Sequence, residues 1–135
     1  MTQSDGLSDR SDPLRGFGRE AVPSLTWWHL FLWLARQLER YKVSGPSMQP
    51  TLHAGTEILV DCRASALASV RVGDVIYMRH PIDSDTRMIK RVVARDAETG
   101  RYTVHGDNPQ QSTDSRTFGA VGQEHVLGRV CCTFP

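Results

Sequence analysis

The stretches Gly73-Asp-Val-Ile-Tyr-Met-Arg79 and Arg87-Met-Ile-Lys-Arg-Val-Val-Ala94 decide the fold class of this chain. Both are rich in residues that favour strands, and His80-Pro81 interrupts the chain between them. Further runs of the same kind lie at 56–61, 100–105 and 125–131. Short runs of this type, separated by Gly, Pro and Asp turns, predict an all-β fold of the barrel or sandwich kind.

Length and composition limit the remaining possibilities. A chain of 135 residues is long enough for one domain with a single core. Its formal charge of +1 gives no reason to expect nucleic acid as a partner. Three cysteines and five histidines show no metal-binding spacing, so we expect no metal and no cofactor. The adjacent Cys131 and Cys132 are best explained as ordinary thiols at the end of a strand.

The chain divides into three parts by composition. Residues 1–24 are polar, contain several acids and lack an apolar period, which predicts a disordered segment that is no cleavable signal peptide. Residues 25–42 begin with an apolar, Trp-rich run and end in charged residues, which predicts a hydrophobic or amphipathic helix. Residues 43–135 hold the predicted strands and form the expected catalytic domain.

The Trp-rich run at 25–35 allows two interpretations. It contains His29 and is shorter than the about 20 apolar residues that a membrane-spanning helix needs. Its aromatic residues suit a helix that lies in a membrane interface, and they suit equally a helix that covers the core of its own domain. The sequence therefore predicts a cytoplasmic or peripherally membrane-associated protein.

The segment Ser44-Gly-Pro-Ser-Met-Gln-Pro-Thr-Leu52 places a serine on a constrained turn. Gly45 and Pro46 bend the chain before Ser47, and Pro50 restricts the residue that precedes it. Such a turn can present a serine hydroxyl beside a backbone N–H. Taken alone, Ser47 is more simply explained as a turn former.

If the run at 88–93 is a strand, one of its two cations must lie on an apolar face. On a strand Met88, Lys90 and Val92 share one face, and Ile89, Arg91 and Val93 share the other. A buried lysine is costly unless it is paired or neutral. An edge strand with both cations in water is the simpler reading of this segment alone.

The third segment, residues 106–119, is dense in polar side chains. Alone it would be explained as a well-capped surface loop. Together, the three segments and the 73–76 run resemble the type I signal peptidase family, the S26 serine peptidases. The matching positions are Ser47, Met48 and Pro50 to Leu52; Gly73 to Ile76; Ile89 to Val93; and Gly106 to Asn108 with Ser112, Asp114, Ser115, Arg116 and Gly119.

This resemblance implies a role for each matched residue. Ser47 would be the nucleophile and Lys90 the general base, with Ser112 orienting the amine. Asp114 and Arg116 would form a supporting ion pair, and Met48 would lie in the substrate groove. The chemistry requires a neutral lysine at working pH, about 3 units below the ordinary pKa of about 10.4, and burial can supply such a shift.

Two departures from the family pattern bear on the site. Many members carry a serine two residues before the nucleophile that donates to the oxyanion, and here that residue is Gly45. The oxyanion hole would then consist of the Ser47 backbone N–H and the Ser44 hydroxyl. Only residues 91–105 separate Lys90 from Gly106, where larger members carry an additional β-domain.

This compact core resembles the short subgroup that matures nickel-type superoxide dismutase by removing a leader before a histidine. The expected partner is a peptide or protein precursor, such as that of the dismutase. A general leader peptidase is the alternative for the substrate, and a non-catalytic β-domain that binds peptides by strand addition is the alternative from another class. A self-cleaving repressor relative is disfavoured, because about 40 residues before the Ser47 segment leave too little room for a DNA-binding domain.

Overall fold

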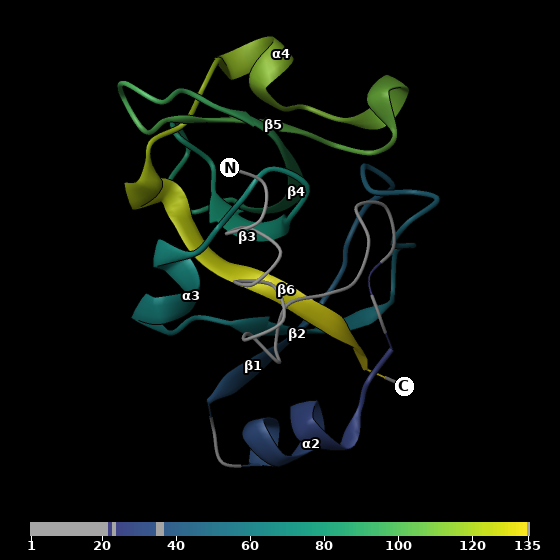
Figure 1. Cartoon of the computed structure of the whole chain (residues 1–135). Coiled ribbons are helices and arrows are strands. Elements are labelled where there is room, and N and C mark those ends of the chain that lie inside the picture. The colour runs from purple at the N-terminus through teal and green to yellow at the C-terminus, as the bar shows by residue number, and fades with distance from the viewer. Residues whose placement is uncertain (1–21, 23, 35–36, 135) are drawn as a thin grey trace.

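The structure, a computed structural model, describes residues 22, 24–34 and 37–134. In this part of the chain one six-stranded sheet dominates, with a few short helices around it (Figure 1). The all-β prediction is therefore confirmed. The strands are β1 (Leu38–Lys42), β2 (Glu57–Asp61), β3 (Val75–Arg79), β4 (Arg87–Arg95), β5 (Tyr102–His105) and β6 (Val126–Phe134). The helices are α2 (Trp27–Leu34), α3 (Ala64–Ala68) and α4 (Ser115–Phe118), with 3-10 turns η1 (Pro109–Gln111) and η2 (Gln123–His125).

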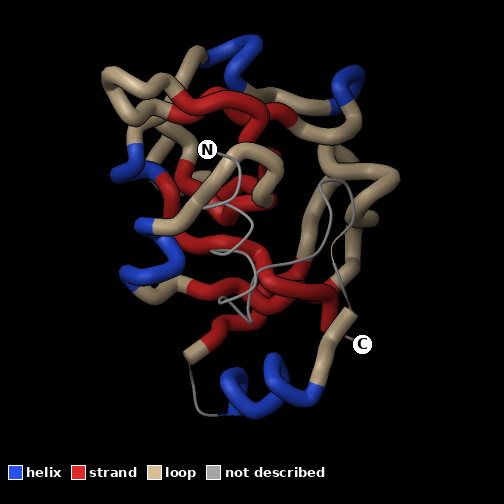
Figure 2. Tube along the Cα trace, in the orientation of Figure 1, coloured by secondary structure: helices blue, strands red, loops and turns tan. Residues whose placement is uncertain are grey.

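The sheet is antiparallel and has the strand order β1-β2-β6-β3-β4-β5. Figure 2 shows its strands in red, with the helices in blue at the outside of the molecule. The last strand, β6, lies at the centre of the sheet and joins the two halves. Its residues 129–134 pair with β2, and its residues 126–129 pair with β3. The fold is thus completed only when the C-terminal strand inserts between two earlier hairpins.

The sheet curls so that strands distant in the order approach each other. Tyr41 of β1 and Tyr77 of β3 stack with ring centroids 4.2 Å apart, although β2 and β6 lie between their strands. Such closure is typical of small β-barrels, which bring the two ends of a sheet together. It also brings β1 next to the strand pair β3–β4.

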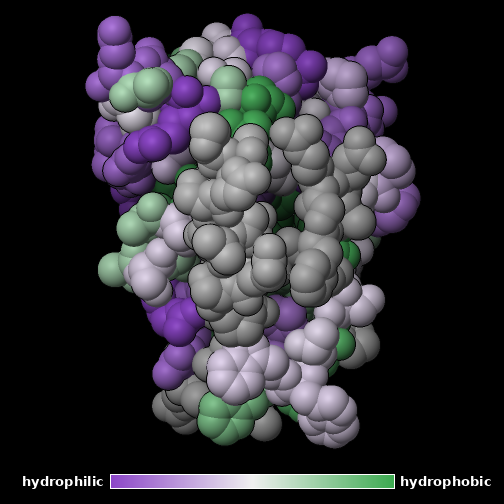
Figure 3. Space-filling model, viewed as in Figure 1, coloured by the Kyte–Doolittle hydropathy of each residue, from purple (hydrophilic) through white to green (hydrophobic). Residues whose placement is uncertain are grey.

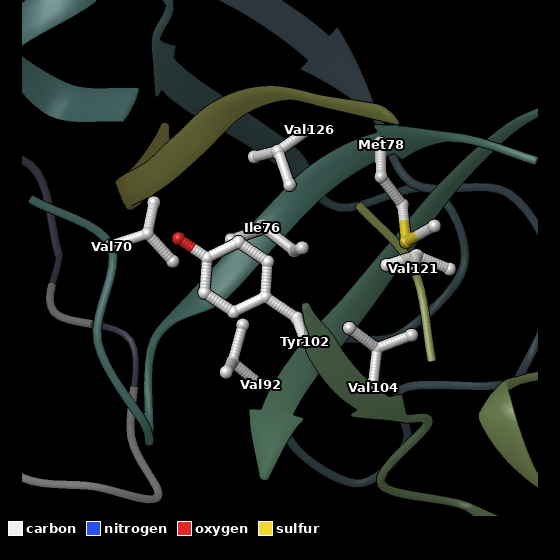
Figure 4. Close-up of a cluster of buried hydrophobic side chains, with 8 residues drawn as sticks. All are labelled: Val70, Ile76, Met78, Val92, Tyr102, Val104, Val121 and Val126. Atoms are coloured by element: carbon white, nitrogen blue, oxygen red, sulfur yellow. The ribbon is translucent and has the colours of Figure 1, made fainter. Parts of the chain in front are cut away.

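One hydrophobic cluster fills the half of the molecule built by β3, β4 and β5 (Figure 4). Val92 is fully buried there, and Met88 packs against the same cluster, as strand alternation from Lys90 predicts. The fully or nearly buried members are Val70, Ile76, Met78, Val92, Tyr102, Val104, Val121 and Val126.

Two further clusters lie on opposite faces of β2. Ile58 and Val60 point into a cluster that also holds Met48 and Leu52 of the serine turn. Leu59 points to the other face. This period of two anchors the Ser47 turn on the core of the sheet.

Cys131 and Cys132 both belong to the cluster on the Leu59 face. Successive residues of a regular strand would alternate, but the register of β6 shifts here: Leu59 pairs with Cys132 and Val60 with Val130. Cys131 is the extra residue of a β-bulge. Both cysteines are buried and form no disulfide, and burial raises the pKa of Cys132 to about 12.

The predicted helix over 25–42 is too long. The helix α2 covers residues 27–34, and the Thr26 hydroxyl accepts the backbone N–H of His29 at its start. Residues 38–42 instead form β1 and pair with β2. The charges of residues 38–42 fit a helix end and an edge strand equally well, so the pairing with β2 decides that these residues form a strand. The prediction for residues 1–24 lies outside the described residues, apart from Val22 and Ser24.

The helix α2 has two different faces. Its Trp33 ring packs against Phe134 and the Leu59-side cluster, and His29 is buried. Trp27, Trp28 and Phe31 face outward with 86%, 47% and 60% of their surface exposed. In Figure 3 the lower end of the molecule, where α2 lies in Figure 1, is pale to green, whereas saturated purple gathers at the upper end. Among the described residues no helix is long and apolar enough to cross a membrane.

Candidate functional site

The Ser47 turn is held at its base and on its inner side. At the base, the Val43 N–H donates to the Thr56 carbonyl and the Gly55 N–H donates to the Val43 carbonyl, each at 2.8 Å. On the inner side Met48 and Leu52 are each only 1% exposed. Gly45 has φ +80°, a conformation that favours glycine and gives the turn its bend. The turn is therefore fixed, while Ser47 itself stays partly exposed.

A second loop is fastened to this turn through its backbone. The Asn108 N–H donates to the Ser47 carbonyl at 2.8 Å, and the Asn108 side-chain amide donates to the Pro46 carbonyl at 3.1 Å. Two segments about 60 residues apart in the chain are joined at the serine. The 106–112 loop therefore sets the position of Ser47.

The ion pair between Arg91 and Asp107 also stabilises the junction between the Ser47 turn and the 106–112 loop. The Arg91 guanidinium donates to both carboxylate oxygens of Asp107, at 3.0 and 2.8 Å, and to the Gly73 carbonyl at 2.8 Å. The Thr51 hydroxyl donates to Asp107 at 2.6 Å. Asp107 thus connects β4 to the end of the serine turn. A bidentate pair of this kind restricts orientation as well as distance.

Gly106 lies where no side chain fits. A Cβ atom added there would be 2.2 Å from the Ser112 hydroxyl oxygen and 2.6 Å from the Ser47 carbonyl oxygen. Real Cβ atoms essentially never approach so closely. Glycine at this position lets the Ser112 hydroxyl and the Ser47 carbonyl come together in the space that a side chain would occupy.

Lys90 is buried, with 3% of its surface exposed. It lies on β4 opposite Ile76. Its Nζ donates to the Ser112 hydroxyl at 3.0 Å, and that hydroxyl donates to Asp114 at 2.7 Å. Burial lowers the pKa of Lys90, the nearby Asp114 carboxylate opposes this, and the Arg116 charge adds to the lowering.

Asp114 is the most heavily hydrogen-bonded carboxylate of this site. It is fully buried and accepts from the Gly106 N–H at 2.8 Å, from Ser112, and from the Arg116 backbone and guanidinium. Burial by itself would raise the pKa of Asp114, but these hydrogen bonds, led by those from Arg116, outweigh it and hold the pKa well below its usual range. Asp114 is therefore a fixed negative charge that orders the loop around Ser112.

Ser47 and Lys90 line one pocket of about 220 Å³. The predicted residues Ser44 and Met48 line it too, while Ser112 and Asp114 lie behind Lys90. The pocket lies between the β1 side and the start of β4. Its other lining residues are Tyr41, Lys42, Val43, Tyr77, Arg87, Met88 and Ile89.

Sequence reasoning assigned no site role to several residues that the structure places here. Three of them, Arg91, Asp107 and Asn108, fall inside the matched motifs. Their position in those motifs was the signal in the sequence that could have marked them as site residues. Tyr41 and Tyr77 had no signal, because only the curl of the sheet brings them to the pocket. Among the described residues no group of three His, Cys, Asp or Glu side chains is arranged to hold a metal ion.

We expect Asp114→Ala to lower the free energy of unfolding by about 3–5 kcal/mol, because it strips the partner from a buried N–H and from Arg116. Urea denaturation at neutral pH measures this, with the exposed Asp85→Ala as control. The lowered pKa also predicts that the Asp114 contribution is complete above the unfolded pKa of about 3.9 and is lost as the pH falls below it. Equal stability of the two variants would contradict this role.

Comparison with known proteins agrees with the motifs that surround this pocket. The family model described as "Signal peptidase, peptidase S26" matches residues 19–99 and 94–134. The mitochondrial ATP-independent inner membrane protease subunit 1a of Arabidopsis thaliana is 29% identical over an alignment that covers 85% of this chain and 84% of that protein. The mitochondrial inner membrane protease subunit 1 of Schizosaccharomyces pombe is 35% identical, over 64% of this chain and 67% of that protein. Signal peptidase I of Aquifex aeolicus is 33% identical, over 51% of this chain and only 27% of that protein.

The family model covers nearly the whole part of the chain that forms the sheet, including the Ser47 turn, the Lys90 strand and the 106–119 loop. The relatives are named as proteases, which agrees with a peptidase. None of the three is named for superoxide dismutase maturation, so the comparison supports the family and not that subgroup. The chain belongs to the signal peptidase S26 family of peptidases.

Proposed function

We propose that this protein is a serine endopeptidase that uses Ser47 as nucleophile and Lys90 as general base to remove an N-terminal leader peptide. The observation that carries this proposal is that both side chains line one pocket while Lys90 is buried. Burial disfavours the charged ammonium, so the pKa falls toward the range in which an amine accepts a proton.

Formation of the acyl ester needs two transfers of the same proton. Neutral Lys90 takes the proton of the Ser47 hydroxyl as its oxygen bonds to the substrate carbonyl carbon. The ammonium then gives this proton to the leaving amine, and the peptide C–N bond breaks to leave an acyl ester on Ser47. Lys90 next deprotonates a water molecule, whose oxygen bonds to the ester carbon. The Lys90 ammonium then returns the proton to the Ser47 oxygen as the ester C–O bond breaks, which releases the leader and regenerates both residues.

Ser112 holds the amine for these steps. Its hydroxyl accepts from Lys90 and donates to Asp114, so its two hydrogen bonds have defined directions. Asp114 in turn is fixed by Arg116 and the Gly106 N–H. The amine is thereby oriented without a histidine.

The Ser47 backbone N–H and the Ser44 hydroxyl are the proposed oxyanion donors. Ser44 lines the same pocket and makes no hydrogen bond through its hydroxyl within the described part of the chain. The left-handed Gly45 lies between the two serines and turns the chain there. A donor aimed at the developing negative charge contributes about 10²–10³-fold to the rate.

The open edge of β4 supports extended binding of the substrate. Residues 87–90 pair with β3 on one side, whereas β5 pairs only with residues 91–95 of β4. A peptide can therefore add a strand beside residues 87–90 and end at Lys90 and Ser47. Its first and third residues before the cut would then lie level with Lys90 and Met88, on the face of β4 that these two share, while Met48 lines the same pocket. We expect small side chains at both positions.

A serine-reactive acyl probe followed by peptide mass spectrometry tests the proposal. Labelling at Ser47 is expected to be lost in Lys90→Arg, because the nucleophile is then not activated. A protein that binds peptides but is never labelled at Ser47 would be the non-catalytic strand-adding domain instead.

The short connection between Lys90 and Gly106 favours a dismutase precursor as substrate, through the resemblance to the short subgroup. The protein should be incubated with a nickel superoxide dismutase precursor and with an ordinary secretory precursor, and the new N-termini should be sequenced. Cleavage just before the histidine of the dismutase supports maturation. Cleavage of the secretory leader alone assigns the protein as a general leader peptidase.

We further propose that the outer face of α2 contacts a membrane interface. Trp27, Trp28 and Phe31 are exposed together, and tryptophan is enriched at membrane–water interfaces. Replacing all three with serine should abolish co-sedimentation with phosphatidylcholine–phosphatidylglycerol vesicles. The exposed Ile82→Ser is the matched control and should bind as the unchanged protein does. Vesicle binding by the triple variant at the level of the unchanged protein would show that the outer face of α2 is not the membrane contact.

Gly106→Ala is expected to lower kcat/KM by about 10²-fold or more, because its methyl group must displace the Ser112 hydroxyl or the Ser47 carbonyl. Kinetics with a cleavable leader peptide measure the effect, and circular dichroism checks the fold. Gly122→Ala is the control glycine, since it lies outside the pocket with φ −80°, and its methyl group would meet only the carboxylate end of the exposed Glu124 side chain, which can move. Full activity of Gly106→Ala would show that Ser112 and Ser47 need not be so close.

A further inference from the structure

Two cations lie at the mouth of the pocket that holds Ser47. Lys42, at the end of β1, and Arg87, at the start of β4, both line the pocket and are both exposed. The curl of the sheet brings them to one pocket from strands that are far apart in its order. We refer to Lys42 and Arg87 as the cationic rim.

The cationic rim has no carboxylate of its own. Other cations of the described residues form ion pairs, among them Arg40 with Glu57, Arg63 with Asp61, Arg91 with Asp107 and Arg116 with Asp114. Within the same described residues Lys42 makes no ion pair, and Arg87 donates to the Ser84 carbonyl at 2.6 Å. The rim charges are therefore available to a ligand.

Two acids close to the rim in the sequence, Asp83 and Glu39, are engaged in other contacts, and the exposed Asp85 forms no ion pair with Arg87 in the described part of the chain. The Asp83 carboxylate accepts the Thr86 hydroxyl at 2.6 Å and the Asp85 backbone N–H, which stabilises the turn before β4. Glu39 accepts the Tyr41 hydroxyl. Neither carboxylate is in an ion pair with Lys42 or Arg87.

A third cation strengthens the positive potential at the rim. Arg79 of β3 lies directly opposite Arg87 in the strand register, so both side chains leave the same face of the sheet. Like charges in such a cross-strand pair are unfavourable. The protein as a whole carries a formal charge of only +1, so this concentration of positive charge is local.

The position of the rim relative to the nucleophile defines what it would contact. Arg87 precedes Lys90 by three residues on β4, which corresponds to about 10 Å along a strand. Consider a substrate strand that lies beside residues 87–90 and ends at Ser47. Its fourth residue before the cut would lie next to Arg87. In an extended peptide the second and fourth side chains point away from the apolar floor that the first and third would contact.

We propose that the cationic rim selects leader peptides with an acidic side chain at the fourth position before the cut. This inference rests on the proposed peptidase function and on the extended binding mode. A carboxylate there would meet Lys42 from one side and Arg87 from the other. The chemical class recognised is thus an acidic leader segment, with small residues between the acid and the scissile bond.

Three leader peptides that differ only in the fourth residue before the cut, Asp, Ala or Lys, test the proposal. At low ionic strength we expect kcat/KM for the Asp peptide to exceed that for the Lys peptide about tenfold, and the ratio to fall toward one as salt screens the charges. The double variant Lys42→Glu/Arg87→Glu should reverse the order. Lys42→Arg keeps the charge and should keep the order. Equal cleavage of all peptides, or an unchanged order in the double variant, would contradict the proposed role of the cationic rim.

A binding measurement separates failure of the rim from failure of the peptidase. Fluorescence anisotropy of the same labelled peptides on Ser47→Ala requires no cleavage. Tighter binding of the Asp peptide, reversed in the triple variant Ser47→Ala/Lys42→Glu/Arg87→Glu, supports the rim even if no peptide is cleaved by the unchanged protein. Equal binding of the Asp and Lys peptides overturns it.

Discussion

Ser47→Ala is expected to lower kcat/KM for a leader peptide by about 10⁴-fold or more, because no acyl ester can form without the hydroxyl. The fold should be unaffected. Ser47 is attached through its backbone carbonyl to Asn108, and that hydrogen bond does not depend on the side chain. The free energy of unfolding should therefore stay within about 0.5 kcal/mol of the unchanged protein.

Steady-state kinetics and denaturation of the same preparation measure both parts. Ser84→Ala, an exposed serine in the turn before β4, is the matched control and should retain full activity. Turnover of Ser47→Ala close to that of the unchanged protein would remove Ser47 from the mechanism. A large loss of stability would instead give the serine a structural role.

Lys90→Arg is expected to be inactive to a similar extent although the positive charge is retained. A guanidinium does not deprotonate in proteins, so it cannot accept the Ser47 proton. The pocket must also accommodate a larger planar group at a position that is 3% exposed. Arg95→Lys, the reverse exchange at an exposed position of the same strand that does not line the pocket, is the control and should retain activity.

The pH dependence gives an independent measure of the same group. Lys90 acts only when neutral, so kcat/KM should rise with pH with a slope of one and level off above the pKa of Lys90. Burial lowers that pKa, so the plateau should begin below about 10.4, the ordinary lysine value. A profile that still rises steeply at that pH, or substantial turnover by Lys90→Arg, would contradict the dyad.

The strands could be predicted because their signals are local. β2, β3, β4, β5 and β6 differ from the predicted runs only at their ends, and in β3 the difference is the turn pair Gly73-Asp74. Each run combines β-branched residues with a turn residue before it, as Gly73-Asp74 precedes β3. Such preferences act within a few residues and need no partner strand to be visible.

β1 could not be predicted in this way. Leu38-Glu-Arg-Tyr-Lys42 has one apolar residue at its start and charges that suit a helix end. It is a strand because β2 offers a complete row of hydrogen-bonding partners from Glu57 to Asp61. Tertiary pairing therefore overrides a weak local preference.

The motifs identified the residues of the site, but only the tertiary structure decided their surroundings. The order of Ser47, Lys90, Ser112 and Asp114 in matched segments is a property of the sequence by itself, as is the all-β class. That Lys90 is buried rather than exposed at an edge depends on the 106–116 loop, which folds back so that Ser112 accepts from it. The pocket with its Tyr41–Tyr77 wall and its cationic rim exists only because the sheet curls. Chain order encodes local conformation and reactive groups, whereas desolvation and charge proximity depend on contacts between distant segments, which no local pattern specifies.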